Sequence, residues 1–194
     1  MTKIKQPKRP SNNATKQKTT TPKKKTIKKP RMRQAYGTSK LEAYFATEFL
    51  DKLGLNYIYE YEAKDIKRFY DFAIVAVPEE TQPIYEEKHG VKCIDYMKNT
   101  VRTLFLIEVD GNFYHPDTKK VKWDELSPMQ KHNAMVDKIK NEWCVKHRIP
   151  LLRFWESDIR NNPSMVLKEL KEMLDKLSKR DQIKAGLNRP HPRQ

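Results

Sequence analysis

The stretch RFYDFAIVAV, residues 68–77, restricts the fold of this chain more than any other segment. It is rich in aromatic and β-branched residues, which favours a β-strand. After Arg68 it is apolar at both odd and even positions except at Asp71, whereas a strand with one face in water alternates apolar and polar residues. The stretch therefore predicts a central strand covered on both sides by helices.

The remaining segments predict helices and strands around this central strand. Residues 39–54 predict an amphipathic helix, in which Ser39 is the N-cap, Glu42 points towards the core and Gly54 ends the helix. The other expected elements are strands at 55–62, 100–110 and 149–155, a helix that follows Ser127 with Pro128 at its first position, and a closing helix from about Asn162. The order α-β-β-β-α-β-α predicts an α/β fold in which helices flank a mixed sheet.

Three finer expectations concern the interior of these elements. Residues 78–99 are polar and irregular, and predict a long connection with a short helix. The strand at 100–110 has a period of two that places four residues on one face: Leu104, Leu106, Glu108 and Asp110. The helix after Ser127 is expected to bury one line of residues: Met135, Ile139 and Trp143.

The positive charge of the chain lies at its two ends. The formal net charge is +15, yet residues 1–36 hold 13 Lys and Arg with no acid, and residues 179–194 hold five with one acid. Residues 37–178 carry 22 bases against 24 acids. We therefore expect a basic arm at 1–36, one slightly acidic domain at 37–178 and a basic tail at 179–194. Both ends are expected to be disordered, because such polar segments cannot bury enough apolar surface.

The basic arm predicts a polyanionic partner. Bases separated by Pro and Thr attract phosphate backbones through counterion release without reading sequence, so DNA is expected and RNA is not excluded. An anionic membrane, an import-like address and a solubilising role are the alternatives. The expected contact residues in the arm are Lys23, Lys24, Lys25, Lys28, Lys29, Arg31 and Arg33. In the domain, they are Lys131 and Lys140.

Composition disfavours several other classes of protein. No run approaches the roughly 18 apolar residues of a membrane span, and the arm lacks the apolar centre of a signal peptide. Cys93 and Cys144 are too few for a disulfide framework or a cysteine zinc site, which favours a reducing, cytoplasmic compartment. With five glycines and no phosphate-binding loop, the chain is not expected to bind a nucleotide cofactor.

Three carboxylates, on Asp71, Glu108 and Asp110, interrupt otherwise apolar strands. A charged carboxylate in such a place is costly unless it is paired, protonated or bound to a metal. If the two strands are neighbours, the three acids meet at one end of the sheet. Their hard oxygen atoms then predict a Mg²⁺ or Mn²⁺ site, which can activate water and neutralise charge on a phosphate. Ordinary salt bridges at the strand ends are the alternative.

A histidine, His115, follows Asp110 after a turn at Gly111. Histidine transfers protons near neutral pH, either as a base towards water or as an acid towards a departing 3′ oxygen. A solvent-exposed loop histidine is the alternative. Three lysines of the next helix are expected either to stabilise a pentavalent phosphate or to form a solvated helix face: Lys131, Lys138 and Lys140.

These motifs together resemble the very-short-patch repair (Vsr-like) endonuclease superfamily and the homing nucleases related to it. The residues that carry the resemblance are Glu42, YDF at 70–72, IEVDGNFYH at 107–115, Asp137-x-x-Lys140 and LLRFWESDIRNNPSMVLKEL at 151–170. The resemblance covers roughly residues 38–178. It implies the three-layer PD-(D/E)xK restriction-endonuclease-like fold, and a nucleoid-associated enzyme in the cytoplasm of a bacterial or phage-infected cell.

The resemblance also implies roles for individual residues. Asp71 matches the metal-binding aspartate, and Glu108 matches the second carboxylate of the PD-(D/E)xK signature. Asp110 and His115 match the two positions that are histidines in the repair enzyme, while Glu42 resembles a glutamate of the first helix. Asp110 stands where the wider fold has lysine, which leaves His115 as the expected proton-transfer group. The aromatic wedge and zinc site of the repair enzyme have no readable counterpart.

The sequence thus predicts a Mg²⁺-dependent DNA endonuclease, with Asp71, Glu108 and Asp110 as metal ligands and His115 and Glu42 as further catalytic residues. The basic ends are expected to hold DNA non-specifically. The rival hypothesis is a non-catalytic nucleic-acid-binding or packaging protein on a nuclease-like scaffold. A third hypothesis is an enzyme or binder directed at RNA.

Overall fold

The computed structural model describes residues 39–115 and 121–186. The expected contact residues of the basic arm, from Lys23 to Arg33, lie outside this part of the chain. The strands are β1 (Tyr57–Ala63), β2 (Arg68–Ala76), β3 (Tyr85–Lys88), β4 (Val91–Ile94), β5 (Arg102–Asp110) and β6 (Leu151–Trp155). The helices are α1 (Lys40–Phe45), the π-helix η1 (Ala46–Asp51), the 3₁₀-helix η2 (Trp123–Glu125), α2 (Pro128–His147), α3 (Glu156–Asn161), α4 (Pro163–Asp175) and α5 (Lys179–Lys184).

The main sheet has four strands in the order β1-β2-β5-β6. The pairs β1–β2 and β2–β5 are antiparallel, and β5–β6 is parallel. A mixed sheet with flanking helices, as predicted, is therefore confirmed, and β2 is one of its two inner strands. Strands β2 and β5 are neighbours, which is the arrangement required for Asp71, Glu108 and Asp110 to meet.

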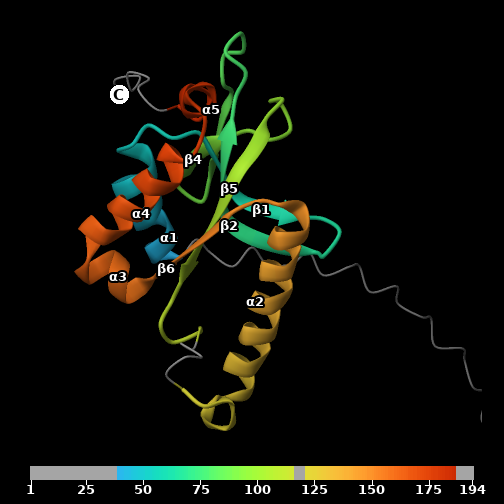
Figure 1. Cartoon of the computed structure of the whole chain (residues 1–194), viewed down its shortest axis with the longest axis vertical. Helices are drawn as coiled ribbons and strands as arrows, with labels where there is room; N and C mark the ends of the chain where they lie inside the picture. Colours follow the sequence, from blue (N-terminus) through green and yellow to red (C-terminus); the bar gives the residue numbers. More distant parts are fainter. Residues whose placement is uncertain (1–38, 116–120, 187–194) are drawn as a thin grey trace, which may run out of the picture. The chain divides into compact units, whose positions relative to one another are not determined.

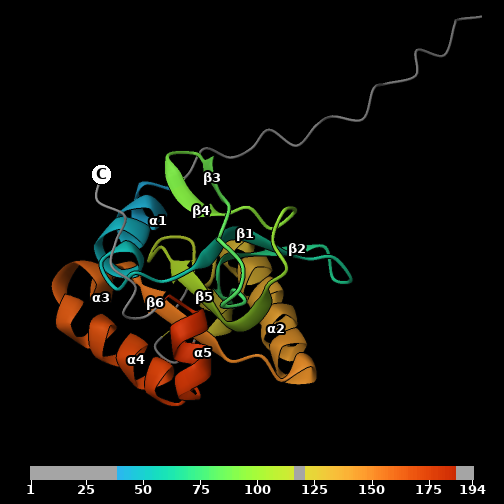
Figure 2. The same ribbon diagram turned by 90° about the horizontal axis from the view of Figure 1, so that it is seen from above.

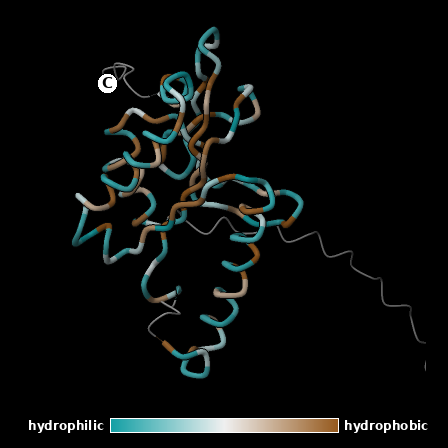
Figure 3. The backbone as a smooth tube through the Cα atoms, in the orientation of Figure 1, coloured by the Kyte–Doolittle hydropathy of each residue, from teal (hydrophilic) through white to brown (hydrophobic). Residues whose placement is uncertain are grey.

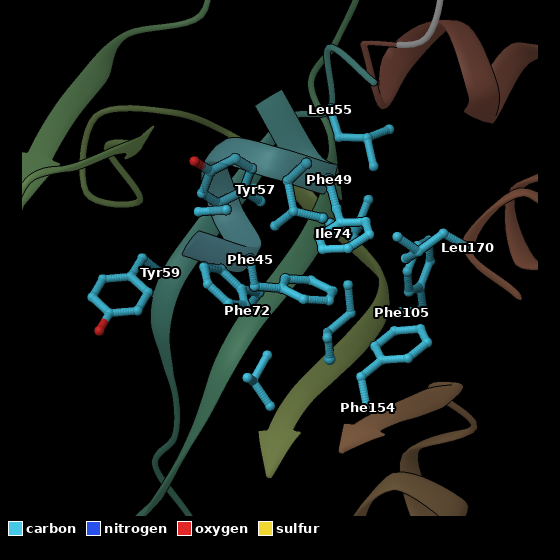
Figure 4. Packing of buried hydrophobic residues seen from close by; sticks show 14 of the residues in the cluster. Phe45, Phe49, Leu55, Tyr57, Tyr59, Phe72, Ile74, Phe105, Phe154 and Leu170 are labelled. Carbon is cyan, nitrogen blue, oxygen red and sulfur yellow. The ribbon is translucent and has the colours of Figure 1, made fainter. Parts of the chain in front are cut away.

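Helices cover both faces of this sheet (Figures 1 and 2). The first face packs against α1, η1, α3 and α4 through a core with many aromatic rings (Figure 4). Phe45 of α1 lies at its centre, with its ring centroid 5.8 Å from that of Phe72 in β2 and 5.4 Å from that of Phe154 in β6. Phe45 thus packs the helical layer against both β2 and β6. This contact covers one of the two apolar faces of β2.

The second face carries a smaller core, and among the described helices it is α2 that packs there. Ser127 caps α2 and Pro128 is its first residue, as predicted. Trp143 is buried as expected, but the expectation was wrong for Met135 and Ile139, which are 60% and 40% exposed. The N-terminal half of α2 runs beyond the strands in Figure 1, and Figure 3 colours much of this helix as hydrophilic. These two side chains therefore have little apolar surface to cover.

Residues 78–99 contain a β-hairpin in place of the expected irregular connection with a short helix. Strands β3 and β4 pair antiparallel, and Lys88 lies opposite Val91. The two residues between them, His89 and Gly90, have φ angles of 53° and 80°. Positive φ at both central residues matches the twist of a two-residue hairpin, which explains the glycine.

A register shift in the β2–β5 pair explains a second difference. Ile74 pairs with Phe105 while Val75 pairs with Thr103, so Leu104 is an extra residue in the ladder. Leu104 consequently joins the core under α1 and α4, whereas Leu106 faces α2. The expectation that both lie on one face was wrong.

The first residues of the expected basic tail, 179–194, form a helix. Residues 179–184 form α5, which Ser178 caps through a hydrogen bond from the Asp181 amide. The carbonyl of Lys184 accepts hydrogen bonds from the Val77 amide at 2.9 Å and the Asn56 side chain at 3.1 Å. These contacts fasten α5 to the sheet, so the described domain extends past residue 178.

Candidate active site

The predicted catalytic residues meet in one cavity of about 550 Å³ at the end of the sheet where β5 finishes. Its lining includes all five of them and one predicted lysine: Glu42, Asp71, Glu108, Asp110, His115 and Lys140. They come from α1, β2, β5, the turn after β5 and α2. These residues are separated by almost a hundred positions in the sequence. The pairing of β2 with β5, and the packing of α1 and α2 on the two faces of the sheet, bring them together.

The antiparallel register places Asp71 beside Glu108. Phe72 pairs with Ile107, so the next step along both strands brings Asp71 and Glu108 together. The alternation of β2 also breaks at Asp71, because Tyr70 packs on the α2 side and Phe72 on the α1 side. An Asp71 Oδ2 atom accepts a hydrogen bond of 2.7 Å from the Val109 amide, which fixes the carboxylate at the end of the sheet.

Glu42 enters the cavity from α1. Its Oε2 atom accepts a hydrogen bond of 2.6 Å from the hydroxyl group of Tyr59. Burial, followed by the charge of Asp71, raises the pKa of Glu42 from 4.5 to about 7. The expected direction of this glutamate towards the core is consistent with both observations.

Glu108 is paired with Lys140 of α2. The lysine Nζ atom lies 2.8 Å from both carboxylate oxygens, and the two side chains are 11% and 3% exposed. Burial and then the charge of Asp71 nevertheless raise the pKa of Glu108 to about 8, against the opposing effect of Lys140. Burial is also the main reason why the pKa of Asp71 is raised. One lysine therefore compensates only part of the negative charge of these acids.

The chemistry of Glu42, Asp71 and Glu108 fits a hard divalent cation. Burial, and for Glu42 and Glu108 then the charge of Asp71, raises the pKa values of these carboxyls, so a bound cation would compete with protons for them. Within residues 39–115 and 121–186, no group of three or more His, Cys, Asp and Glu is arranged to hold an ion. Mg²⁺ needs only one or two carboxylates because it keeps several waters. Asp71 and Glu108, which lie next to the paired residues Phe72 and Ile107, are the acids that would hold it.

Asp110 is held differently from the other two strand acids. Its Oδ2 atom accepts a hydrogen bond of 2.8 Å from Arg153 of β6, and its Oδ1 atom lies 3.6 Å from His115 Nδ1. Strand β6 runs parallel to β5 and places Arg153 opposite Glu108 in the register. Asp110 thus belongs to a contact network with Arg153 and His115, which sets it apart from the acids placed for a cation.

His115 is held by a residue that the sequence did not single out as catalytic, Asp137 of α2. The distance between His115 Nδ1 and Asp137 Oδ2 is 2.9 Å. Burial would raise the pKa of Asp137, but the hydrogen bond from His115 and the charge of Arg153 lower it on balance. An ionised carboxylate only accepts, so His115 Nδ1 carries the hydrogen and Nε2 is left for proton transfer. Burial lowers the pKa of His115, but Asp137 and then Asp110 raise it above 6.5.

The turn that carries His115 is fastened to α2 by further polar contacts. Gln130 donates to the Phe113 carbonyl at 3.3 Å, and Asn133 donates to the Tyr114 carbonyl at 2.9 Å. Residues 130, 133 and 137 lie on one face of a helix and contact residues 113, 114 and 115 in order. This polar face explains how the half of α2 that buries few apolar residues is held.

The remaining lysines of the prediction do not all reach the cavity. Among the described residues that line it, Lys140 is present, whereas Lys131 and Lys138 are not. Lys138 lies 3.9 Å from Glu142 on the exposed face of α2. Two bases that the sequence reasoning missed, Lys40 and Arg160, do line the cavity. Their signal was weak because each is one base among many on a helix.

Comparison with known proteins found no matching family model, no matching curated protein and no matching solved structure. In the part of the chain that the structure describes, no helix has the length and apolar character needed to cross a membrane.

Proposed function

We propose that this protein is a Mg²⁺-dependent DNA endonuclease with a restriction-endonuclease-like fold, related to the very-short-patch repair enzymes. The observation that carries the proposal is the meeting of Asp71, Glu108 and His115, with Lys140, in one cavity. Buried acids with raised pKa values, a histidine fixed by a carboxylate and a buried lysine are the groups that hydrolysis of a phosphodiester needs. Cytoplasm that contains DNA is the compartment in which such an enzyme would act.

Asp71 and Glu108 would hold the cation, which would activate water and neutralise charge on the scissile phosphate when bound. The protein's own residues supply the rest. His115, with its Nδ1 hydrogen directed to Asp137, exchanges a proton through Nε2 with the attacking water or the departing oxygen. Lys140 supplies positive charge beside Glu108 as the phosphate becomes pentavalent. Lys40 and Arg160 at the cavity wall offer charges for the neighbouring phosphates.

A plasmid assay tests this proposal. The full chain is incubated with supercoiled DNA in Mg²⁺ and in EDTA, and nicked and linear products are separated. We expect cutting only in Mg²⁺. A matched RNA of the same sequence decides between DNA and RNA as the substrate, because a basic arm cannot distinguish them. Equal cutting in EDTA would contradict the cation requirement, and cutting of RNA alone would favour an RNA-directed enzyme.

The rival function is non-catalytic binding or packaging of nucleic acid. The 13 bases of the arm favour it, because they suffice for binding without any cavity. Titration calorimetry separates the two functions. An endonuclease should bind Mn²⁺ in the wild type and lose this binding in Asp71→Asn, whereas a packaging protein should bind DNA tightly without binding the cation.

A further inference from the structure

We propose that Arg153 is a positioning residue that fixes the imidazole of His115 by holding Asp110 and Asp137 at the same time. This inference rests on the proposed function, in which His115 transfers the proton. It assigns a role to a residue of β6 that lies within the LLRFW motif but to which the resemblance gives no role of its own.

The four side chains form a closed ring of polar contacts. Arg153 donates to Asp110 Oδ2 at 2.8 Å through one terminal nitrogen and to Asp137 Oδ1 at 3.3 Å through the other. The second oxygen of each acid faces the same atom, His115 Nδ1, at 3.6 Å from Asp110 and 2.9 Å from Asp137. Each carboxylate therefore has one oxygen on the arginine and one towards the histidine.

The planar guanidinium suits this task better than an ammonium would. Its two terminal nitrogens lie in a fixed fork, so binding one acid sets the direction towards the other. Arg153 is 21% exposed, and the acids are 2% and 17% exposed, so the contacts are largely shielded from water. A lysine at the same position would offer a single point charge and could not fix both carboxylates in one geometry.

Arg153 is not expected to contact the substrate. It is missing from the described residues that line the active-site cavity, and instead lines a second cavity of about 550 Å³. That cavity lies between the C-terminal half of α2 and β6, and its other lining residues are Asn141, Cys144, Val145, Arg148, Ile149, Pro150 and Leu151. Asp110 and His115 line the first cavity and Arg153 lines the second, and the printed contacts join Arg153 to His115 through the two acids.

The second cavity offers a direct experiment, which is chemical rescue. Arg153→Ala should lower kcat by about 10- to 100-fold with little change in KM, because the residue that is lost does not contact substrate. Guanidinium ion at millimolar concentration should enter the vacated space from the second cavity and restore a large part of kcat. Urea, a neutral molecule of similar shape, should not. Arg102→Ala is the matched control, since Arg102 is paired with Asp181 of α5 and lies outside the ring.

A spectroscopic readout makes the test independent of turnover. In the wild type, long-range ¹⁵N–¹H correlation at a pH where the ring is neutral should show the hydrogen of His115 on Nδ1, with the signal assigned through His115→Gln. Arg153→Ala should give a mixture of both tautomers, and guanidinium should restore the single form. If wild-type protein fails to cut DNA, the proposed function fails, while this readout still decides the role of Arg153.

If Arg153→Ala does not fold, Arg153→Lys carries the test and should give a partial loss of kcat and a partly mixed tautomer. A folded Arg153→Ala protein with unchanged kcat and an unchanged His115 spectrum would overturn the proposal. So would a rise in KM at constant kcat, because it would place Arg153 in contact with substrate.

Discussion

The Nζ atom of Lys140 lies 2.8 Å from both carboxylate oxygens of Glu108, in the wall of a cavity that also holds Asp71 and His115. The sequence has aspartate at position 110, where the PD-(D/E)xK signature that it resembles has lysine after the acid. In the folded protein, α2 delivers a lysine to the same acid from a distant part of the chain. A positive charge beside Glu108 is therefore present despite the departure from the motif.

Removal of this lysine should destabilise the protein in a pH-dependent way. Lys140→Met leaves Glu108 buried without its partner, which costs about 3 kcal/mol where the glutamate is ionised. The pKa of Glu108 is raised to about 8 in the folded protein. The protonated carboxyl therefore adds to the free energy of unfolding at low pH, and this stabilisation is lost as the pH rises through 8. Urea unfolding should show a larger loss at pH 9 than at pH 6.

The control for this experiment is a second substitution at the same pair. Lys140→Met combined with Glu108→Gln should remove most of the pH dependence, because the buried carboxylate that Lys140 contacts is then absent as well. Lys138→Met, on the exposed face of α2, should change stability by less than about 0.5 kcal/mol. An equal loss at both pH values in Lys140→Met would contradict the importance of the buried charge.

Glu42 gives a second prediction about pH. Its pKa is raised from 4.5 to about 7 by burial and by Asp71, so its contribution to stability is complete below pH 4.5 and lost as pH rises through 7. Glu42→Gln keeps a group that can accept from Tyr59 but does not ionise. We expect it to be more stable than wild type by about 1–2 kcal/mol at pH 8 and equal at pH 4.

Urea unfolding at both pH values checks this, with Glu48→Gln as the control. Glu48 is a partly exposed residue of η1 paired with Lys52, outside the cavity lining. A Glu42→Gln protein that loses stability at pH 8 would show that the carboxylate is held ionised there.

The pair of His115 and Asp137 predicts linked effects on proton transfer. His115→Gln should lower kcat by about 10²- to 10⁴-fold, the usual contribution of a general acid or base. Asp137→Asn should lower the pKa of His115, because the hydrogen bond and the charge of Asp137 are what raise it. NMR titration of the His115 ring measures this shift. A midpoint unchanged in Asp137→Asn would contradict the assigned hydrogen bond.

The strands and the acids could be predicted from the sequence because their signal is local. Apolar runs marked β2 and β5, and Asp71 and Glu108 stood out as charges inside them. Arg153 and Asp137 could not be assigned in this way. Their meeting depends on the parallel pairing of β6 with β5 and on the rotation of α2 about its axis, which no pattern within either segment encodes.

Two local errors have different physical causes. The hairpin of β3 and β4 was missed because its turn is His89-Gly90, a less common choice than Asn-Gly for two residues with positive φ. The burial of Met135 and Ile139 was predicted from helical periodicity, which identifies a face but not whether a sheet lies under it. Polar contacts to the turn after β5 hold that part of α2 instead.

The basic arm predicts a change in salt dependence. A protein that begins at residue 37 lacks 13 bases and should bind DNA more weakly, with a flatter plot of log affinity against log salt. The slope should fall by about 0.9 for each phosphate contact that is lost. Fluorescence anisotropy at several salt concentrations measures it. An unchanged slope would show that the arm does not contact phosphates.

Nicking of supercoiled plasmid in Mg²⁺ by Asp71→Asn tests most directly whether this cavity is the site of a metal-dependent nuclease. The substitution keeps the size of the side chain and an oxygen that can accept from the Val109 amide, but removes the charge beside Glu108. Asp65→Asn is the control, since Asp65 accepts from Trp143 and lies outside the cavity lining. We expect Asp65→Asn to cut like wild type and Asp71→Asn to lose at least about 10³-fold in rate. Cutting by Asp71→Asn at the wild-type rate would contradict the proposed function.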